Sequence, residues 1–448
     1  MSRFFYVLSQ TKSVMNLANK ADVLLGLQWG DEGKGKVVDV LTPDYQMVAR
    51  FQGGPNAGHT LEFGDKKYIL HTIPSGIFHE STTNVIGSGV VIDPVIFCRE
   101  LESLGLSPER IRKNLVISAK AHLILPSHRL LDAANEASKG DLKIGSTLKG
   151  IGPAYTDKVA RTGLRLGDAL RSDFDSLYEK LKSTHLNQAQ ALGFDSDGFS
   201  LEGIPFDEYE QRWMDGLEYL RSLPMVESEV FVNNALDKGI RVLAEGAQGS
   251  LLDIDFGSYP FVTSSSTIAA GACTGLGLAP SRIGEVFGIF KAYCTRVGSG
   301  PFPTELFDAD GDLMRKQGNE FGSTTGRPRR CGWLDLPALK YSVMINGVTR
   351  LIMTKADVLS VFPAIKACTS YQYKGKTIDY LPTGYDPDAL KPVYQVFKGW
   401  ESNLRDDSSF NTLPEHLLQF IRTIEEYTGV PVWMVSTGPD RSQVIIRE

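Results

Sequence analysis

The fold is decided around residues 23–41, VLLGLQWGDEGKGKVVDVL. The apolar run from Val23 to Leu27 has the length of a buried strand. A glycine-rich turn follows, and the apolar pattern from Lys36 to Leu41 indicates a helix that ends before Pro43. A strand, a glycine loop and a helix in this order bring backbone N–H groups together at a helix N-terminus, where they bind phosphate. The stretch therefore predicts a site for a nucleotide phosphate.

This loop is close to a Walker A sequence but departs from it at two points. Four residues separate Gly30 from Gly35-Lys36, as in G-x-x-x-x-G-K, but a valine stands where a nucleoside triphosphatase has the Ser or Thr that ligates magnesium. The loop also contains two carboxylates, Asp31 and Glu32. A carboxylate among phosphates is repelled unless a cation or a proton transfer compensates. We therefore expect Asp31 to contact Mg²⁺, to act as a base, or both; the alternative is a glycine-rich turn with solvated charges.

Composition narrows the class of protein. The 448 residues are 42% hydrophobic and 22% charged, as in soluble globular proteins, and the net charge of −6 argues against a general nucleic-acid-binding surface. No apolar run approaches the roughly 20 residues that span a bilayer, and the N-terminus lacks the pattern of a secretory signal. The five cysteines form no C-x-x-C pair, and their odd number suits a reducing compartment. We expect a cytoplasmic protein with no nucleic-acid or membrane partner.

Apolar runs alternate with helical patterns along the chain. Strands are expected near residues 47–51, 61–63, 67–70, 115–118, 241–244, 286–290, 350–353 and 432–436, and helices near residues 95–104, 335–345 and 413–427. This alternation predicts an α/β fold: a single large domain with a mostly parallel central sheet, like a P-loop nucleoside triphosphatase. Residues 168–239 are predicted as a helical insertion and residues 363–392 as a peripheral antiparallel patch. Residues 1–20 precede the first core strand and are predicted as an extension to a domain of residues 21–448.

A second glycine-rich loop, residues 53–60 (GGPNAGHT), follows a predicted strand. Glycines let the backbone approach a ligand closely. His59 in this position is suited to proton transfer or to stabilising anionic charge. The alternative is a structural histidine.

Three later stretches carry polar groups suited to anions and bases. Residues 145–155 combine glycines with Ser, Thr and Lys and read as a loop for the phosphate of a second substrate, or as an ordinary surface loop. Residues 245–250 and 262–267 offer an amide and a run of hydroxyls, which are weak signals on their own and fit a satisfied turn equally well.

Two stretches in the last third of the chain give stronger chemistry. Residues 322–330 contain three arginines in four residues behind glycines and hydroxyls, a pattern that suits bidentate binding of a dicarboxylic acid. Residues 351–357, LIMTKAD, are an apolar strand that ends in T-K-x-D, in which one carboxylate accepts two hydrogen bonds from the edge of guanine. Residues 436–441 follow the last predicted strand and would close over the base.

Residues 28–36, QWGDEGKGK, resemble the signature of the adenylosuccinate synthetase family, and similar motifs continue to about Arg441. The resemblance implies a GTP-dependent ligase that joins IMP and L-aspartate into adenylosuccinate through a 6-phosphoryl-IMP intermediate, at the first committed step of AMP biosynthesis. It implies Asp31 as the base that removes a proton from the purine ring, and His59 as the acid that stabilises the transferring phosphoryl group. It implies Mg²⁺ as the cofactor, ligated by Asp31 and the carbonyl of Gly58.

The resemblance also implies the substrate contacts. The GTP set is Gly30, Asp31, Glu32, Gly33, Lys34, Gly35, Lys36, Gly58, His59, Thr60, Arg329, Lys355, Ala356, Asp357, Ser436, Thr437 and Gly438. The IMP set is Asp31, Lys34, Asn56, His59, Thr147, Arg161, Gln248, Thr263 and Arg327. The aspartate set is Ser323, Thr324, Thr325, Gly326, Arg327 and Arg329. In the family the residue that matches Arg161 reaches the phosphate site of the other subunit, so a homodimer is implied.

Two other functions are open to these residues. A GTP-binding switch or regulator would use the same glycine loop and T-K-x-D element, but needs neither the arginine cluster, the loop at residue 145 nor His59. Another nucleotide-driven ligase would act on a different acid. Phosphate release from GTP, with IMP and aspartate added singly and together, separates the three.

Overall fold

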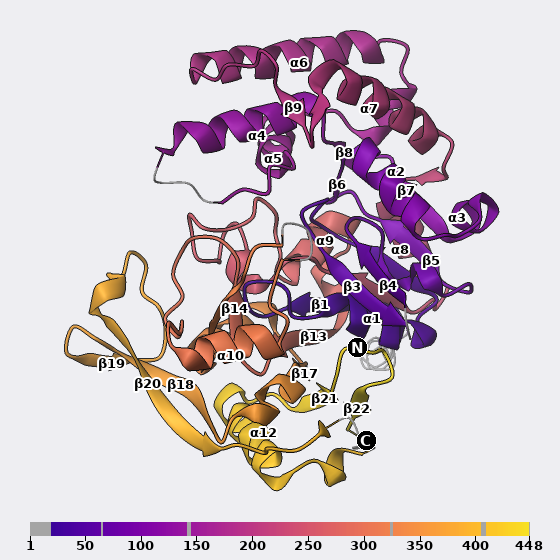
Figure 1. Ribbon diagram of the computed structural model, residues 1–448. Coiled ribbons are helices and arrows are strands. Elements are labelled where there is room, and N and C mark those ends of the chain that lie inside the picture. The colour runs from indigo at the N-terminus through magenta and orange to yellow at the C-terminus, as the bar shows by residue number, and fades with distance from the viewer. Residues whose placement is uncertain (1–18, 64–65, 141–144, 323–325, 405–408, 448) are drawn as a thin grey trace, which may run out of the picture.

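A large sheet runs through the computed structural model, which describes residues 19–63, 66–140, 145–322, 326–404 and 409–447 (Figure 1). Within those residues its strand order is β11-β7-β5-β2-β12-β1-β13-β17-β21-β22. Its strands are β1 Ala21–Gly26, β2 Met47–Arg50, β5 Thr83–Ile86, β7 Leu115–Ser118, β11 Met225–Val226, β12 Val242–Glu245, β13 Ile283–Lys291, β17 Arg350–Thr354, β21 Val432–Ser436 and β22 Val444–Ile446. The neighbours pair in parallel except β21 and β22, so the predicted mostly parallel α/β fold is confirmed.

Strand β1 lies in the middle of this sheet and is apolar on both faces. Val23 and Leu25 pack into the core on one face, together with side chains of α8 Ser228–Asp237, α9 Ala270–Leu276, α11 Leu336–Asn346 and α12 Glu415–Thr428. Leu24 packs on the other face, against α1 Lys34–Leu41. All three side chains are at most 1% exposed, and burying each contributes about 1.5–3 kcal/mol. The glycine loop thus starts from a fixed strand end.

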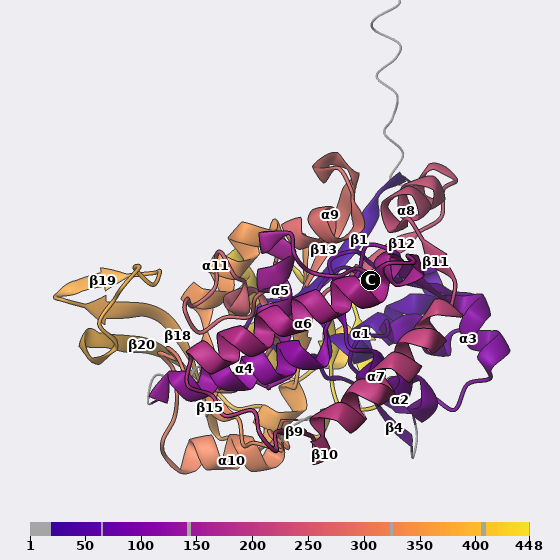
Figure 2. The same ribbon diagram turned by 90° about the horizontal axis from the view of Figure 1, so that it is seen from above.

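A layer of helices lies over one end of the sheet (Figures 1 and 2). It contains α2 Pro94–Ser103, α4 Pro126–Ser138, α5 Ile151–Ala160, α6 Phe174–Ala191 and α7 Phe206–Arg221, with α3 Pro108–Asn114 beside it. A second core, which includes the buried side chains of Tyr178 and Trp213, joins α6 and α7 to α2 and to strands β5 and β7. The stretch 168–239 is mostly helical, but it also carries β11, which pairs with β7 and so completes one edge of the sheet.

The interpretation of residues 145–155 as one continuous loop is wrong after Gly150. Gly150 adopts φ +72° as the N-cap of α5, and the helix runs to Ala160. Ile151, Ala154 and Tyr155 are buried at helical spacing. The three glycines in the stretch masked that spacing.

Smaller sheets surround the central one. The predicted antiparallel patch is confirmed as β18 Ala364–Tyr373, β19 Lys376–Ile378 and β20 Leu390–Lys398, with the short β16 Leu334–Asp335 parallel to β18. The two-stranded pairs are β3 His59–Phe63 with β4 Lys66–Leu70, β6 Val91–Ile92 with β8 His122–Leu123, β9 Ser200–Leu201 with β10 Ile204–Pro205, and β14 Cys294–Arg296 with β15 Arg330–Gly332. Helix α10 is Ala309–Gln317. Among the helices that the structure describes, none combines the length and apolarity of a membrane span. Of the predicted extension, residues 1–18 lie outside the described residues.

Candidate functional site

The glycine loop joins β1 to α1 through a run of left-handed backbone. Gly30 has φ +85°, Asp31 φ +61° and Gly33 φ +92°. Glycine takes such angles at no steric cost, and aspartate is among the side chains that tolerate them best. Helix α1 then begins at Lys34, so its first N–H groups face the loop. The predicted strand, loop and helix are therefore in place.

The two carboxylates of the loop point in opposite directions. Glu32 is fully buried and accepts hydrogen bonds from the backbone N–H groups of Gln28 and Gly30, at 3.1 and 2.9 Å, and from Nζ of Lys34 at 2.5 Å. A Cβ on Gly26 would lie 2.2 Å from its Oε2, so only glycine fits there. The side chains of Glu32 and Lys34 therefore make buried contacts that fix the shape of the loop. The backbone of both residues remains available to bind a phosphate.

Asp31 points outward and meets the arginine loop. Its side chain is 28% exposed, and its Oδ2 lies 2.8 Å from Nε of Arg329. The same guanidinium contacts Glu320 at 2.5 Å, and Glu320 is also paired with Lys291 at 2.9 Å. Burial raises the pKa of Glu320, but the surrounding cations outweigh it and lower the pKa to about 2. Glu320 thus fixes the arginine that faces Asp31.

His59 lies against the glycine loop at the start of β3. A Cβ on Gly35 would be 2.8 Å from Cβ of His59, so this glycine permits the close approach. Nδ1 of His59 is 2.7 Å from Oε1 of Glu245, and Nε2 is 3.2 Å from NH1 of Arg50. Burial, helped by the charge of Arg50, lowers the pKa of His59 to about 4. The imidazole is therefore neutral, and with Glu245 ionised it donates its Nδ1 proton to that carboxylate.

Two unpaired amides mark a ligand position beside these groups. Gln248 has a left-handed backbone, φ +56°, and both polar atoms of its side chain are shielded from solvent without a hydrogen-bond partner. The side-chain oxygen of Asn56 is unpaired in the same way. A Cβ on Gly53 would lie 3.2 Å from Oε1 of Gln248, so the loop of Asn56 and the turn of Gln248 are adjacent. Unpaired buried amides are costly unless a ligand completes their hydrogen bonds.

The loop at residues 145–150 is anchored to helix α4. Glu136 accepts from the N–H groups of Gly145 and Ser146, at 2.6 and 3.2 Å. Asp132 accepts from the Ser146 hydroxyl at 2.8 Å and from the N–H of Gly150 at 3.0 Å. Thr147 is left exposed between these anchors.

The N-terminal end of α5 lies between two other parts of the site. A Cβ on Gly54 would be 3.1 Å from Cδ1 of Ile151, and one on Gly152 would be 3.7 Å from the hydroxyl of Ser264, next to Thr263. The loop of Asn56, the start of α5 and the turn of Thr263 thus meet. Of the residues predicted for IMP, these contacts bring the loop of Asn56 next to Gln248 and next to the helix start that faces Thr263.

The T-K-x-D element is placed for a base. Lys355 follows β17 with φ +62°, and Thr354 donates to the carbonyl of Glu32 at 2.7 Å, which ties this strand end to the glycine loop. Asp357 is half-buried, and within the described chain no hydrogen bond or ion pair engages its carboxylate. Its acceptor pair is therefore available.

Lys36 points away from the glycine loop. Its Nζ donates to Oγ of Ser436 at 2.9 Å and to the carbonyls of Gly438 and Gln443 at 2.6 and 3.0 Å. Burial lowers its pKa to about 8. The lysine therefore anchors residues 436–438 beside the glycine loop, and its side chain has no donor left for a phosphate.

The arginine loop is described only in part, because the predicted Ser323, Thr324 and Thr325 lie outside the described residues. Gly326 donates to the carbonyl of Gly322 at 2.8 Å, and Gly322 donates to that of Arg327, also at 2.8 Å, which forms a tight return. Arg327 is exposed. Arg330 points inward and pairs with Glu305 and with the carbonyls of Gly298 and Gly300, so it anchors the C-terminal end of the loop.

The family is shown by comparison with known proteins. The model of the adenylosuccinate synthetase family matches residues 23–445. The adenylosuccinate synthetase of Bacteroides thetaiotaomicron is 59% identical over 429 residues, which cover 96% of this chain and 99% of that protein. The chain belongs to the adenylosuccinate synthetase family. The Porphyromonas gingivalis member is 57% identical over 429 residues, covering 96% of this chain and 99% of that protein. The solved structure of the fully ligated Plasmodium falciparum adenylosuccinate synthetase superposes with a TM-score of 0.87 at 36% identity, over 96% of this chain and 100% of that one.

Membership of the adenylosuccinate synthetase family confirms the resemblance seen in the sequence. The chain is a ligase that forms adenylosuccinate from IMP and aspartate with GTP, in AMP biosynthesis. The GTP-binding switch is not favoured. The individual residue roles remain predictions and are developed below.

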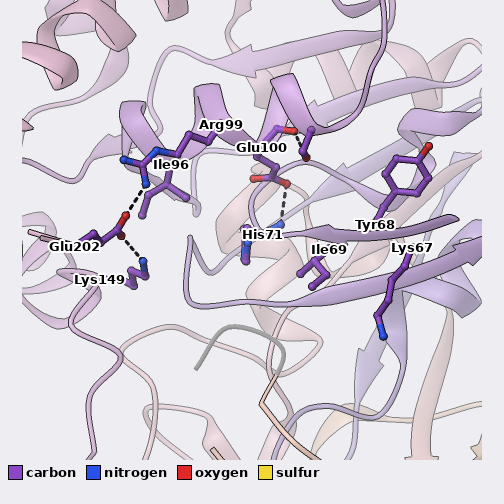
Figure 3. A pocket seen from close by; sticks show the side chains of 10 residues that line it. Lys67, Tyr68, Ile69, His71, Ile96, Arg99, Glu100, Lys149 and Glu202 are labelled. Atoms are coloured by element: carbon purple, nitrogen blue, oxygen red, sulfur yellow. Dashed lines mark hydrogen bonds and ion pairs between the residues drawn. The ribbon is translucent and has the colours of Figure 1, made fainter. Parts of the chain in front are cut away.

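Three side chains at this adenylosuccinate synthetase site were missed in the sequence: Glu245 behind His59, Glu320 behind Arg329, and Glu202. Glu202 lies beside a cavity of about 440 Å³ lined by β4, α2 and the loop of Lys149 (Figure 3). It accepts from Lys149 at 2.6 Å and from Arg129 at 2.8 Å. None of the three stands in a recognisable motif, and the partners of Glu245 and Glu202 lie more than 50 residues away along the chain.

Proposed function

We propose that this chain phosphorylates IMP and then joins it to aspartate where the glycine loop, residues 53–60 and residues 245–267 meet. The proposal is carried by one observation: the side chain of Gln248, buried without a hydrogen-bond partner, belongs to a turn that lies against Gly30 of the glycine loop and against Gly53 of the loop that leads to His59. The roles below follow from the contacts of each side chain.

Asp31 is proposed as the base. It takes the proton from the purine ring nitrogen of IMP, and the exocyclic oxygen on the neighbouring ring carbon attacks the γ-phosphate of GTP, so that GDP leaves and 6-phosphoryl-IMP forms. Its left-handed backbone turns the carboxylate outward from the loop, where Oδ2 lies 2.8 Å from Nε of Arg329. The aspartate amine then attacks the same ring carbon, phosphate leaves, and the amine gives up a proton as the C–N bond forms.

His59 is proposed to hold the transferring phosphoryl group. Glu245 fixes its Nδ1, which leaves Nε2 directed to Arg50 and the glycine loop. As negative charge arrives beside it, the imidazole gains a proton more readily and can donate from Nε2. Glu245 acts through His59 and is a positioning residue.

The substrate contacts are proposed from the same arrangement. GTP takes the backbone of residues 30–36, with Gly58, His59, Thr60 and Arg329 beside its phosphates and Lys355, Ala356, Asp357 and residues 436–438 around guanine. IMP takes Lys34, Asn56, Thr147, Gln248, Thr263 and Arg327 with the two catalytic residues. Aspartate takes the loop 323–329, where arginine forks suit its two carboxylates.

Mg²⁺ is proposed as the metal. Hard oxygen ligands suit it, and the carboxylate of Asp31 and the carbonyl of Gly58 lie on loops in contact through Gly35 and His59. Oδ2 of Asp31 contacts Arg329, and Oδ1 is proposed as the metal ligand. Such an ion supplies charge stabilisation for the phosphates it binds.

A homodimer with Arg161 supplied across the interface is also proposed. Arg161 lies at the C-terminal end of α5, about 13 Å along the axis from Gly152 at the substrate side. The guanidinium is therefore proposed to serve the partner subunit rather than the phosphate site of its own chain. A cytoplasmic location is proposed from the chemistry and from the five cysteines, all of which are free.

Two experiments test these proposals. Phosphate release from GTP is expected only when IMP and aspartate are both present; release with GTP alone would contradict the coupled reaction. For the dimer, mixing inactive Asp31→Asn with Arg161→Ala is expected to restore about a quarter of wild-type activity, because half of the dimers are hybrids and each has one intact site. No recovery from fully exchanged subunits would refute the contribution of Arg161 in trans.

A further inference from the structure

Three polar side chains form a cluster outside the site described above. His128 of α4, Asp157 of α5 and His185 of α6 meet where these helices pack together. Oδ2 of Asp157 lies 2.9 Å from Nε2 of both histidines. The histidines are at most 1% exposed and Asp157 is 15% exposed.

The hydrogen-bond pattern shows which ring nitrogen of His128 carries the proton. The backbone N–H of Leu125 donates to Nδ1 of His128 at 2.9 Å, so Nδ1 carries no proton. The proton of the neutral ring is therefore on Nε2 and is donated to Asp157. A metal at Nε2 would move that proton to Nδ1, where it would face the N–H of Leu125. The three side chains are of types that ligate metals, but the hydrogen bond from Leu125 disfavours a metal ion here.

Asp157 holds the turn that follows α5. Its carbonyl accepts from the backbone N–H groups of Arg161, Thr162 and Gly163. Its Oδ1 accepts from the hydroxyl of Thr162 at 3.1 Å. One residue thus binds the turn through its backbone and through its side chain, while the two histidines fix the carboxylate itself.

The turn forces Arg161 into an unusual conformation. Arg161 has φ +66°, where glycine is the usual residue after a helix. This left-handed conformation costs a residue with a side chain about 1–2 kcal/mol. The side chain is exposed, and within the described residues it makes no hydrogen bond or ion pair. A strained backbone that presents an unpaired cation to the outside indicates a function beyond this chain.

We propose that Asp157 is a positioning residue for Arg161, and that His128 and His185 act through it. The ligand of the positioned guanidinium is a phosphate monoester bound by a second copy of the chain. The inference rests on the proposed function, in which Arg161 completes the IMP phosphate site of the other subunit.

The inference predicts a selective kinetic effect. Arg161→Ala is expected to raise KM for IMP about 10–100-fold, as when a charged hydrogen bond is lost. Asp157→Ala is expected to raise it about 5–20-fold, with KM for GTP unchanged. Thr162→Val removes only the exposed hydroxyl and leaves the buried histidines paired, so it is the variant to use if Asp157→Ala does not fold; a rise of about threefold is expected.

A double-mutant cycle is the decisive test. Asp157→Ala or Thr162→Val combined with Arg161→Ala is expected to give the same KM for IMP as Arg161→Ala alone. A further rise in the double variant, or a parallel rise in KM for GTP, would show a general structural role and overturn the inference.

The remaining outcomes separate the two proposals. If Arg161→Ala raises KM for IMP but neither Asp157→Ala nor Thr162→Val does, the inference fails and the proposed function stands. If Arg161→Ala itself leaves KM for IMP unchanged, the role of Arg161 fails first. Stoichiometric binding of Zn²⁺ to the untagged dimer, lost in Asp157→Ala, would overturn the hydrogen-bond assignment.

Discussion

Replacing Asp31 with asparagine removes the proposed base and little else. Asparagine has the same shape and is the side chain most tolerant of the left-handed backbone at this position, φ +61°. Its amide oxygen can still accept from Nε of Arg329, the atom that lies 2.8 Å from the carboxylate. The ion pair that is lost is partly exposed and worth about 1 kcal/mol or less, so the variant is expected to fold.

The expected loss appears in turnover. General base catalysis contributes about 10²–10⁴-fold, so kcat is expected to fall by that factor. This corresponds to an activation barrier about 3–5.5 kcal/mol higher. GTP binding is expected to stay within about tenfold, because the phosphates meet backbone N–H groups that the change does not touch. Adenylosuccinate formation at saturating substrates and equilibrium binding of GTP are the measurements. The reasoning is refuted if kcat falls less than about tenfold, or if the variant folds but no longer binds GTP.

Three further predictions follow from other contacts. Asp357→Asn is expected to weaken GTP relative to analogues that lack the guanine amino group, since one acceptor becomes a donor; unchanged selectivity in competition assays would contradict this. Lys36→Met is expected to raise KM for GTP about tenfold or more, because three buried acceptors in residues 436–443 lose their donor; a normal KM would show that the anchor is dispensable. Burial lowers the pKa of His59, of His122 and of His128 from 6.5 to about 4. Below pH 6.5 the unfolded chain binds protons that the folded chain does not, so the free energy of unfolding is expected to fall between pH 6.5 and 4, by up to about 3 kcal/mol for each fully buried histidine. Urea denaturation at several pH values measures this, His128→Gln is expected to flatten the slope, and a flat wild-type profile would refute it.

The part of the site that could be predicted from the sequence is the part built from neighbours in the chain. The strand, glycine loop and helix around Gly33 are fixed by local spacing, and so is the placement of His59 at the end of a glycine-rich loop, where β3 begins. The direction of side chains could not be predicted. Glu32 and Lys36 stand close to Asp31 in the sequence, yet their side chains point elsewhere. Glu32 pairs with the backbone of Gln28 and Gly30, and Lys36 pairs with residues 436–443.

The carboxylates behind the catalytic groups were beyond sequence reasoning for the same reason. Glu245 meets His59 across 186 residues, through the register of β12 beside β2. Helix α5 was missed because its glycines outweighed a short apolar pattern, Ile151, Ala154 and Tyr155, whose burial depends on helix α4 and β6. Contacts between segments far apart in the chain, rather than local propensity, decide both features.

The hydrogen bond between Lys36 and Gly438 affects how the chain folds while the ribosome makes it. The two residues are 402 positions apart, so at about 5–20 residues per second the ribosome makes the acceptor roughly 20–80 s after the donor. Strand β1 likewise waits for β12 and β13, its neighbours in the sheet. The glycine loop is thus among the first segments translated and among the last to reach its folded conformation. A nascent chain released before residue 438 leaves the ammonium of Lys36 without its acceptors.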